Sequence, residues 1–271
     1  MKTRIISGAV LVLILGSALL TGKYYLWALC LFISIVGFIE LSKAMAGITD
    51  EKLKVDPMDI LGIAGIIAYY ILILFYPNKS INMFLFFCIL FLIAEMILYV
   101  LTFPKFSTEK MFSTFFGMFY TGVCVACIYL VRNRERGIRL VWLIFISSWI
   151  CDTCAYFSGV ALGKHRLAPI LSPKKSVEGA IGGVVGSTII GGLFAAFAMK
   201  EPKEIVFIYM IICAAGAVIS QFGDLFASAL KRKHDIKDYG RLIPGHGGIL
   251  DRFDSVIITA PIVYMLSVFI K

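Results

Sequence analysis

Long apolar runs recur from one end of the 271-residue chain to the other, and short polar segments separate them. A helix that crosses a bilayer needs about 20 consecutive apolar residues, whereas a transmembrane β-barrel shows short segments of alternating polarity. The pattern therefore predicts an all-α, polytopic membrane bundle of about nine transmembrane helices. We expect these helices near residues 5–21, 24–44, 60–76, 81–103, 111–131, 138–162, 176–199, 205–230 and 249–270.

Composition indicates the same class of protein, because 60% of the residues are hydrophobic and only 16% are charged. The formal net charge is +9, and the cations lie in short loops between the apolar runs, which favours anionic lipids or substrates over nucleic acid as partners. The first run, residues 5–20, follows two cations and precedes no small-residue cleavage site. We therefore expect a retained span rather than a removed signal peptide.

Lysines and arginines predict the orientation of the bundle. With a cytoplasmic N-terminus, most of the 26 lysines and arginines fall in inner loops, although the arginines of loop 132–139 fall outside. The loops at 164–175 and 231–248 are separated by two spans, so we expect both on the same side. We divide the chain into N-terminal helices, residues 1–135, as a lipid-facing or oligomerisation scaffold, and a C-terminal region, residues 136–271, with two polar motif loops.

The segment 228–254 is the longest polar stretch between two apolar runs, and it holds six cations, four carboxylates and two histidines. Asp251 and Asp254 share one face of a helix expected to begin near Gly248, and Asp224 in the preceding span can meet them. A hard cation such as Mg²⁺ relieves the repulsion of converging carboxylates. The glycines let the backbone approach a ligand and lead into a helix N-terminus that favours anions. A solvated basic loop would leave the acids unexplained.

A second loop places Lys174 and Lys175 directly before a predicted helix. Ser176 is suited to be the N-cap of that helix, and Glu178 lies in its first turn. Two cations beside a helix N-terminus predict a phosphate cradle. The structural alternative is an ordinary charged flank of a membrane span.

Carboxyl groups also occur inside the apolar runs, where they are costly and indicate function by default. Asp152 is the clearest case, either as a ligand, a proton carrier or a substrate contact, or as a hydrogen-bonded structural group. We expect structural roles for Glu40 and Glu95, which lie away from the motif loops. Nearly all of the seven cysteines fall in apolar runs, so we interpret them as packing thiols.

The polar segment closely resembles the signature of phosphatidate cytidylyltransferases, also called CDP-diacylglycerol synthases, in the run Ser228-x-x-Lys231-Arg232-x4-Lys237-Asp238-x5-Pro244-x-His246-Gly247-Gly248-x-x-Asp251-Arg252-x-Asp254. The sequence around Asp152 and the run from Ser172 to Gly179 also resemble that family, so the resemblance covers about residues 149–254. It implies an integral membrane enzyme that converts CTP and phosphatidate into CDP-diacylglycerol and pyrophosphate. It also implies a Mg²⁺ requirement, with a second, monovalent cation such as K⁺ as a further option.

The resemblance carries roles onto individual residues. For catalysis it implies Asp224, Lys231, Arg232, Lys237, Asp238, His246, Asp251, Arg252 and Asp254, with Asp224, Asp251 and Asp254 as metal ligands. To substrate binding we assign Asp152, Ser172, Lys174, Lys175, Ser176, Glu178, Gly247 and Gly248. The phosphatidate headgroup is already anionic, so charge neutralisation and in-line positioning would lower the barrier without a covalent intermediate.

Two other functions compete with this interpretation. A secondary transporter would use carboxylates within spans as ion sites, but it predicts related halves, and the chain shows no such repeat. A CTP-dependent lipid-alcohol kinase would release CDP instead of pyrophosphate. The expected partners are CTP, phosphatidate, membrane lipids and a second copy in a homodimer, with no nucleic acid. The expected location is a bacterial inner membrane, with the active site facing the cytoplasm because CTP is cytosolic.

Overall fold

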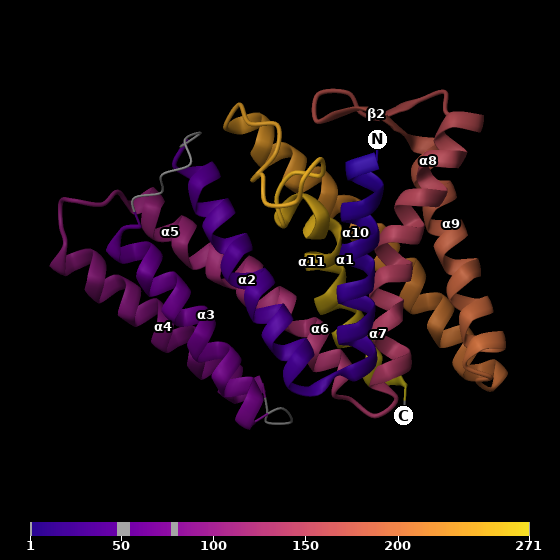
Figure 1. Ribbon diagram of the computed structural model, residues 1–271, viewed down its shortest axis with the longest axis horizontal. Helices are drawn as coiled ribbons and strands as arrows, with labels where there is room; N and C mark the ends of the chain where they lie inside the picture. The colour runs from indigo at the N-terminus through magenta and orange to yellow at the C-terminus, as the bar shows by residue number, and fades with distance from the viewer. Residues whose placement is uncertain (1, 48–54, 77–80, 271) are drawn as a thin grey trace. The chain divides into compact units, whose positions relative to one another are not determined.

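The protein is seen here in a computed structural model that describes residues 2–47, 55–76 and 81–270 (Figure 1). Residues 48–54 and 77–80, which belong to two of the predicted loops, lie outside the described residues. The chain divides into two compact units, the first formed by Met1–Leu130 and His234–Asp251 and the second by Val131–Lys233 and Arg252–Lys271.

The prediction of an all-α membrane bundle is confirmed. The described residues contain eight helices that are long and apolar enough to cross a membrane, whereas the apolar part of the first helix, Ile6–Thr21, is shorter. The helices are α1 (Lys2–Thr21), α2 (Lys23–Met45), α3 (Pro57–Phe75), α4 (Ile81–Leu101), α5 (Thr108–Gly117), α6 (Cys124–Arg132), α7 (Gly137–Phe145), α8 (Cys151–Leu162), α9 (Val177–Leu193), α10 (Lys203–Lys233) and α11 (Leu250–Leu266). Three π-helical turns, η1 (Met118–Val123), η2 (Ile146–Ile150) and η3 (Phe194–Ala198), lie within spans, and a 3₁₀ turn, η4 (Ser267–Phe269), follows α11.

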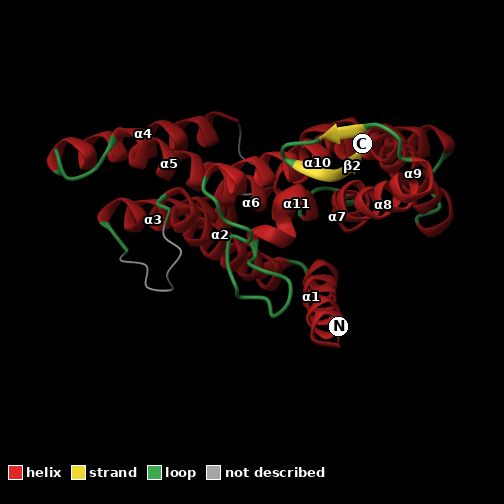
Figure 2. Ribbon diagram, turned by 90° about the horizontal axis from the view of Figure 1, so that it is seen from above, coloured by secondary structure: helices red, strands yellow, loops and turns green. Residues whose placement is uncertain are grey.

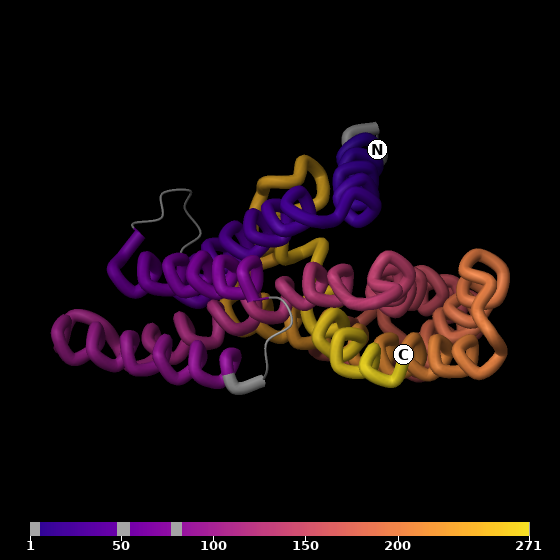
Figure 3. The backbone as a smooth tube through the Cα atoms, turned by 90° about the horizontal axis from the view of Figure 1, so that it is seen from below, coloured from indigo at the N-terminus to yellow at the C-terminus, as the bar shows by residue number. Residues whose placement is uncertain are grey.

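In the first unit, α2 and α3 pack side by side, and α4 lies beside α3 and α5 (Figure 3). The α2–α3 contact is polar at its centre, where Ser34 and Tyr70 share a hydrogen bond of 2.8 Å and Trp27 donates to the Tyr70 carbonyl. A hydrogen bond buried among apolar helices is satisfied on both sides, so it fixes their alignment without leaving an unpaired polar group.

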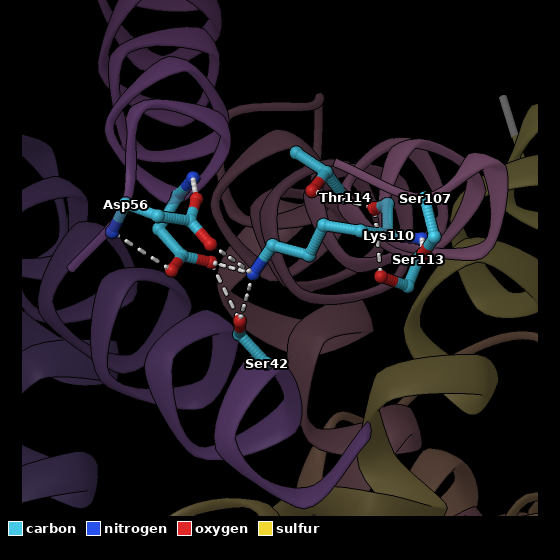
Figure 4. Close-up of polar contacts among 7 residues, drawn as sticks. Ser42, Asp56, Ser107, Lys110, Ser113 and Thr114 are labelled. Carbon is cyan, nitrogen blue, oxygen red and sulfur yellow. Dashed lines mark hydrogen bonds and ion pairs between the residues drawn. The ribbon is translucent and has the colours of Figure 1, made fainter. Parts of the chain in front are cut away.

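One end of the first unit is held by an ion cluster around Lys110 (Figure 4). Asp56 caps α3 through a reciprocal capping box with Asp59, and Pro57 occupies the first helical position, where it needs no hydrogen bond. The Lys110 ammonium, from α5, lies 2.6 Å from Asp59 and 3.2 Å from Asp56, and it also contacts the Ser42 hydroxyl on α2. The cluster therefore ties three helices together.

In the second unit, α8 and α9 form a close antiparallel pair, and α10 packs against α9 (Figure 1). The segment joining α8 to α9, which the sequence predicted as a loop, contains two short strands, β1 (Arg166–Ala168) and β2 (Ser172–Ser176), paired antiparallel (Figure 2). The hairpin leads straight into α9 and so sets the position of the lysines in β2.

Three of the four arginines that disagreed with the charge rule make contacts within the second unit. Arg136 and Arg139 donate to the two carboxylate oxygens of Glu201 at 3.1 and 2.5 Å, and the Glu201 side chain is only 3% exposed. Arg134 stacks over the Tyr264 ring at 4.2 Å. These contacts bring the α6–α7 and α9–α10 connections to the same end of the unit.

Candidate functional site

A cavity of about 640 Å³ in the second unit contains much of the predicted binding site. Asp152 from α8, Lys174 and Lys175 from β2 and Asp224 from α10 all line it, together with Ser176 at the start of α9. Asp152 and Asp224 lie 72 positions apart in the sequence, so the fold and not the local chain brings them together. The cavity combines cations and carboxylates, a combination suited to an anionic ligand held with or without a metal ion.

The charges around this cavity are coupled. The Lys175 ammonium forms an ion pair with the Asp224 carboxylate, and each side chain is 28% exposed. Asp152 and Asp254 both interact electrostatically with Asp224, and Lys231 offsets the charge of Asp254. Three carboxylates from α8, α10 and α11 therefore share one field, and the two lysines attract them while the carboxylates repel each other.

The start of α9 confirms the predicted cap. The Ser176 hydroxyl accepts a hydrogen bond from the Gly179 amide at 3.1 Å. Glu178 contacts a different part of the chain: it accepts from the amides of Lys164 and His165 and lies 2.6 Å from His165 Nδ1. It thereby fixes the turn between α8 and β1, and neither Glu178 nor Ser172 is among the residues that line the cavity.

The predicted residues of loop 234–249 lie in the first unit. Gly245 and Gly247 have φ values of +78° and +88°, which only glycine adopts easily, and a backbone bridge between Ile243 and Gly247 closes the turn. His246 at the turn lies 2.8 Å from the Ser7 hydroxyl of α1 through Nδ1. Lys237 and Asp238 are exposed.

The N-terminus of α11, which the sequence predicts to favour anions, binds carboxylates of the protein itself. Glu40 from α2 accepts hydrogen bonds from the amides of Ile249 and Leu250 at 3.0 and 2.9 Å. Asp251 Oδ2 accepts from the amides of Gly248 and Tyr239 at 2.9 and 2.8 Å. These amides already bind protein carboxylates. Glu40 gave only a weak signal in the sequence, an acid within an apolar run.

The three predicted metal ligands are distributed over both units. Asp251 belongs to the first unit, and Asp224 and Asp254 belong to the second. Asp251 and Asp254 are spaced three residues apart on α11, as predicted, with Arg252 between them, and Lys231 and Arg232 lie in the last turn of α10. Within the described residues, no three His, Cys, Asp or Glu side chains are already arranged to hold a metal ion.

These features define a polytopic helical protein whose charged cavity is built from α8, α9, α10 and the β1–β2 hairpin. The chain matches the sequence profile of the cytidylyltransferase family over residues 2–270, and it belongs to that family. A phosphatidate cytidylyltransferase of Bacillus subtilis is 32% identical over 275 residues, which cover 98% of this chain and 97% of the relative. One from Staphylococcus saprophyticus is 32% identical over 99% of both chains, and one from Thermotoga maritima is 36% identical over 61% of this chain and 59% of the relative.

Proposed function

We propose that this protein transfers the cytidylyl group of CTP to phosphatidate and releases pyrophosphate. Membership of the cytidylyltransferase family supports the type of reaction, and the names of the full-length relatives support the lipid acceptor. The observation that carries the proposal is the cavity in which Lys174 and Lys175 face Asp152 and Asp224. Such a cavity suits a reaction between two phosphate-bearing anions, because it offers cations together with carboxylates that can share a metal ion.

The bond changes follow from the substrates. An anionic oxygen of the phosphatidate headgroup forms a bond to the α-phosphorus of CTP, and the bond from that phosphorus to the bridging oxygen breaks. Pyrophosphate leaves with the electron pair, so no protein nucleophile is required. The lysines of β2 lower the repulsion between the reacting phosphates, and the helix-borne position of the carboxylates keeps the site rigid.

A divalent cation forms part of this proposal. Carboxylate oxygens are the donors that Mg²⁺ prefers. Asp152, Asp224 and Asp254 repel one another, and a bound divalent cation would relieve that repulsion. Mg²⁺, when bound, would neutralise phosphate charge and polarise the α-phosphoryl group. A monovalent cation such as K⁺ beside it is a further part of the proposal. Within the second unit, Asp152, Asp224 and Asp254 are the carboxylates that could hold the divalent cation.

An apolar groove next to the charged cavity favours a lipid acceptor over a soluble one. The groove has a volume of about 490 Å³ and is lined by side chains of α9 and α10, including Ile181, Val185 and Phe222. Leu167, Ala180 and Gln221 line both the groove and the cavity. An amphipathic substrate could therefore lay its acyl chain in the groove while its phosphate enters the cavity.

The test is a pyrophosphate-release assay on detergent-purified protein with CTP, phosphatidate and Mg²⁺, each also omitted in turn. We expect release only with all three, with CDP-diacylglycerol identified by mass. Release of CDP with a phosphorylated lipid alcohol would support the kinase instead, and no turnover across Mg²⁺, Mn²⁺ and added K⁺ would refute the proposal.

Two further parts of the proposal are a homodimer and an active site that faces the cytoplasm. Mass photometry of the same sample would test the homodimer. Cysteines introduced into the motif loops and labelled in inside-out vesicles would test the cytoplasmic site.

A further inference from the structure

Glu40 is a buried acid in the first unit that bonds to a segment about 210 residues away in sequence. It lies on α2 with 6% of its surface exposed. Its Oε1 accepts from the Ile249 amide at 3.0 Å, and its Oε2 accepts from the Leu250 amide at 2.9 Å. A negative charge at a helix N-terminus is stabilising, and here both carboxylate oxygens are used to hold the first turn of α11.

The loop before α11 is shaped around this carboxylate. A Cβ atom added at either Gly240 or Gly248 would overlap the Oε1 atom of Glu40. Both glycines are thus needed at this point for close approach of the backbone to Glu40, whereas the sequence alone suggested that Gly248 makes room for a ligand. The signature loop, residues 234–249, therefore wraps a fixed anion supplied by the protein.

Glu40 and Asp251 divide the amide donors of this region between them. Asp251 Oδ2 takes the amides of Tyr239 and Gly248, and Glu40 takes the next two along the chain. If Glu40 were absent, two amides at a buried helix end would lose their partners, and the backbone that orients Asp251 would lose its support. The position of Asp251 thus depends on Glu40 through the shared loop.

We propose that Glu40 is a positioning residue for cytidylyl transfer, which acts by fixing the signature loop and the first turn of the helix that carries Asp251. This inference rests on the proposed function. Groups that hold a site residue from behind usually contribute about 10- to 100-fold to metal affinity or activity. We expect a loss of that size in kcat for Glu40→Gln, with a higher Mg²⁺ concentration needed for half-maximal rate.

The experiment compares Glu40→Gln with the matched control Glu95→Gln. Both residues are buried glutamates of the first unit, but among the described residues no hydrogen bond joins Glu95 to the signature loop. Three quantities are measured for each purified variant: kcat, the Mg²⁺ concentration for half-maximal rate, and hydrogen exchange in a peptide covering residues 239–251. We expect Glu40→Gln to change all three and Glu95→Gln to change none, while both elute as folded protein.

A normal kcat and Mg²⁺ requirement in folded Glu40→Gln would overturn the proposal, as would an equal loss in Glu95→Gln. If Glu40→Gln does not fold, Glu40→Asp replaces it, because it keeps the charge on a side chain one methylene shorter. Adding Glu40→Asp to Gly248→Ala should also restore part of the kcat that Gly248→Ala loses, because the shorter side chain makes room for the added Cβ. No recovery would count against the close fit between Gly248 and Glu40. Hydrogen exchange in the peptide needs no turnover. If the wild type is inactive but its peptide exchanges more slowly than that of Glu40→Gln, the proposed function is refuted while the role of Glu40 in fixing the loop stands.

Discussion

The ion pair between Lys175 and Asp224 predicts that replacing the lysine will separate stability from catalysis. Lys175→Met removes the ammonium but keeps most of the apolar side chain. It leaves Asp224 facing Asp152 and Asp254 with one cation fewer. We expect the folded state to lose stability and the reaction to lose a cation that faces the phosphates.

The size of each loss follows from the geometry. Breaking a fully buried pair costs about 3–5 kcal/mol, but each partner here is 28% exposed, so solvent screening brings the cost closer to the ~1.5–3 kcal/mol of one charged hydrogen bond. For a chain of this size that is a fall of several degrees in melting temperature. Loss of one preorganised charge at the transition state lowers kcat by about 100- to 1,000-fold.

Mg²⁺ separates the two effects. A cation that binds only the folded protein raises its stability by mass action, so added Mg²⁺ should recover much of the melting temperature of Lys175→Met without restoring kcat. The assays are differential scanning fluorimetry in detergent over a Mg²⁺ series and pyrophosphate release at saturating substrate. The matched control for stability is Lys174→Met, which changes the exposed neighbouring lysine and should leave the melting temperature unchanged.

The reasoning would be refuted if Lys175→Met melted like the wild type without Mg²⁺. It would also be refuted if Mg²⁺ restored kcat and stability together, because the lysine would then act only as a substitute for the metal ion.

Two further predictions concern structural ion pairs. Lys110→Met should lower the free energy of unfolding by about 3–5 kcal/mol, since Asp59 is only 3% exposed and loses its cation. Adding Asp59→Asn should then lower it little further, and a double-mutant cycle by thermal unfolding would measure this. Glu201→Gln should lower the melting temperature and speed proteolysis at loop 132–139 while kcat stays within about twofold, because the arginines that it holds lie outside the charged cavity. Unchanged proteolysis would contradict the role assigned to Glu201.

The sequence was sufficient to predict the spans and part of the charged cavity. Apolar runs of spanning length allow few alternatives to helices, because every backbone group in a membrane needs a hydrogen bond within its own segment. Asp152 and Asp224 could be recognised because a carboxylate inside an apolar run is costly, and Lys175 because it precedes a helix cap. Each of these signals is local to its own segment.

What the sequence could not predict depends on contacts between distant segments. Glu40 and the amides at 249–250 are about 210 residues apart, and nothing near Glu40 distinguishes it from Glu95. The signature loop predicts a helix N-terminus that favours anions, and the amides of Ile249 and Leu250 there do bind one, but the protein supplies it through Glu40. Local patterns identify a site that attracts anions and do not say which anion fills it.

The carboxylates that the sequence assigned to the site differ in how their charge is satisfied, and this difference predicts which of them respond to metal. Glu178 bonds to backbone amides and to His165. Asp152, by contrast, interacts mainly with Asp224 and the Lys175 ammonium. A carboxylate already neutralised by donors gains little from a cation, whereas one that faces another carboxylate gains much. Asp152→Asn should therefore raise about tenfold the Mg²⁺ concentration that gives a half-maximal rise in melting temperature. Glu178→Gln should leave that concentration unchanged. Equal shifts in the two variants, measured by fluorimetry without substrate, would show that amide-bonded and clustered carboxylates bind the metal alike.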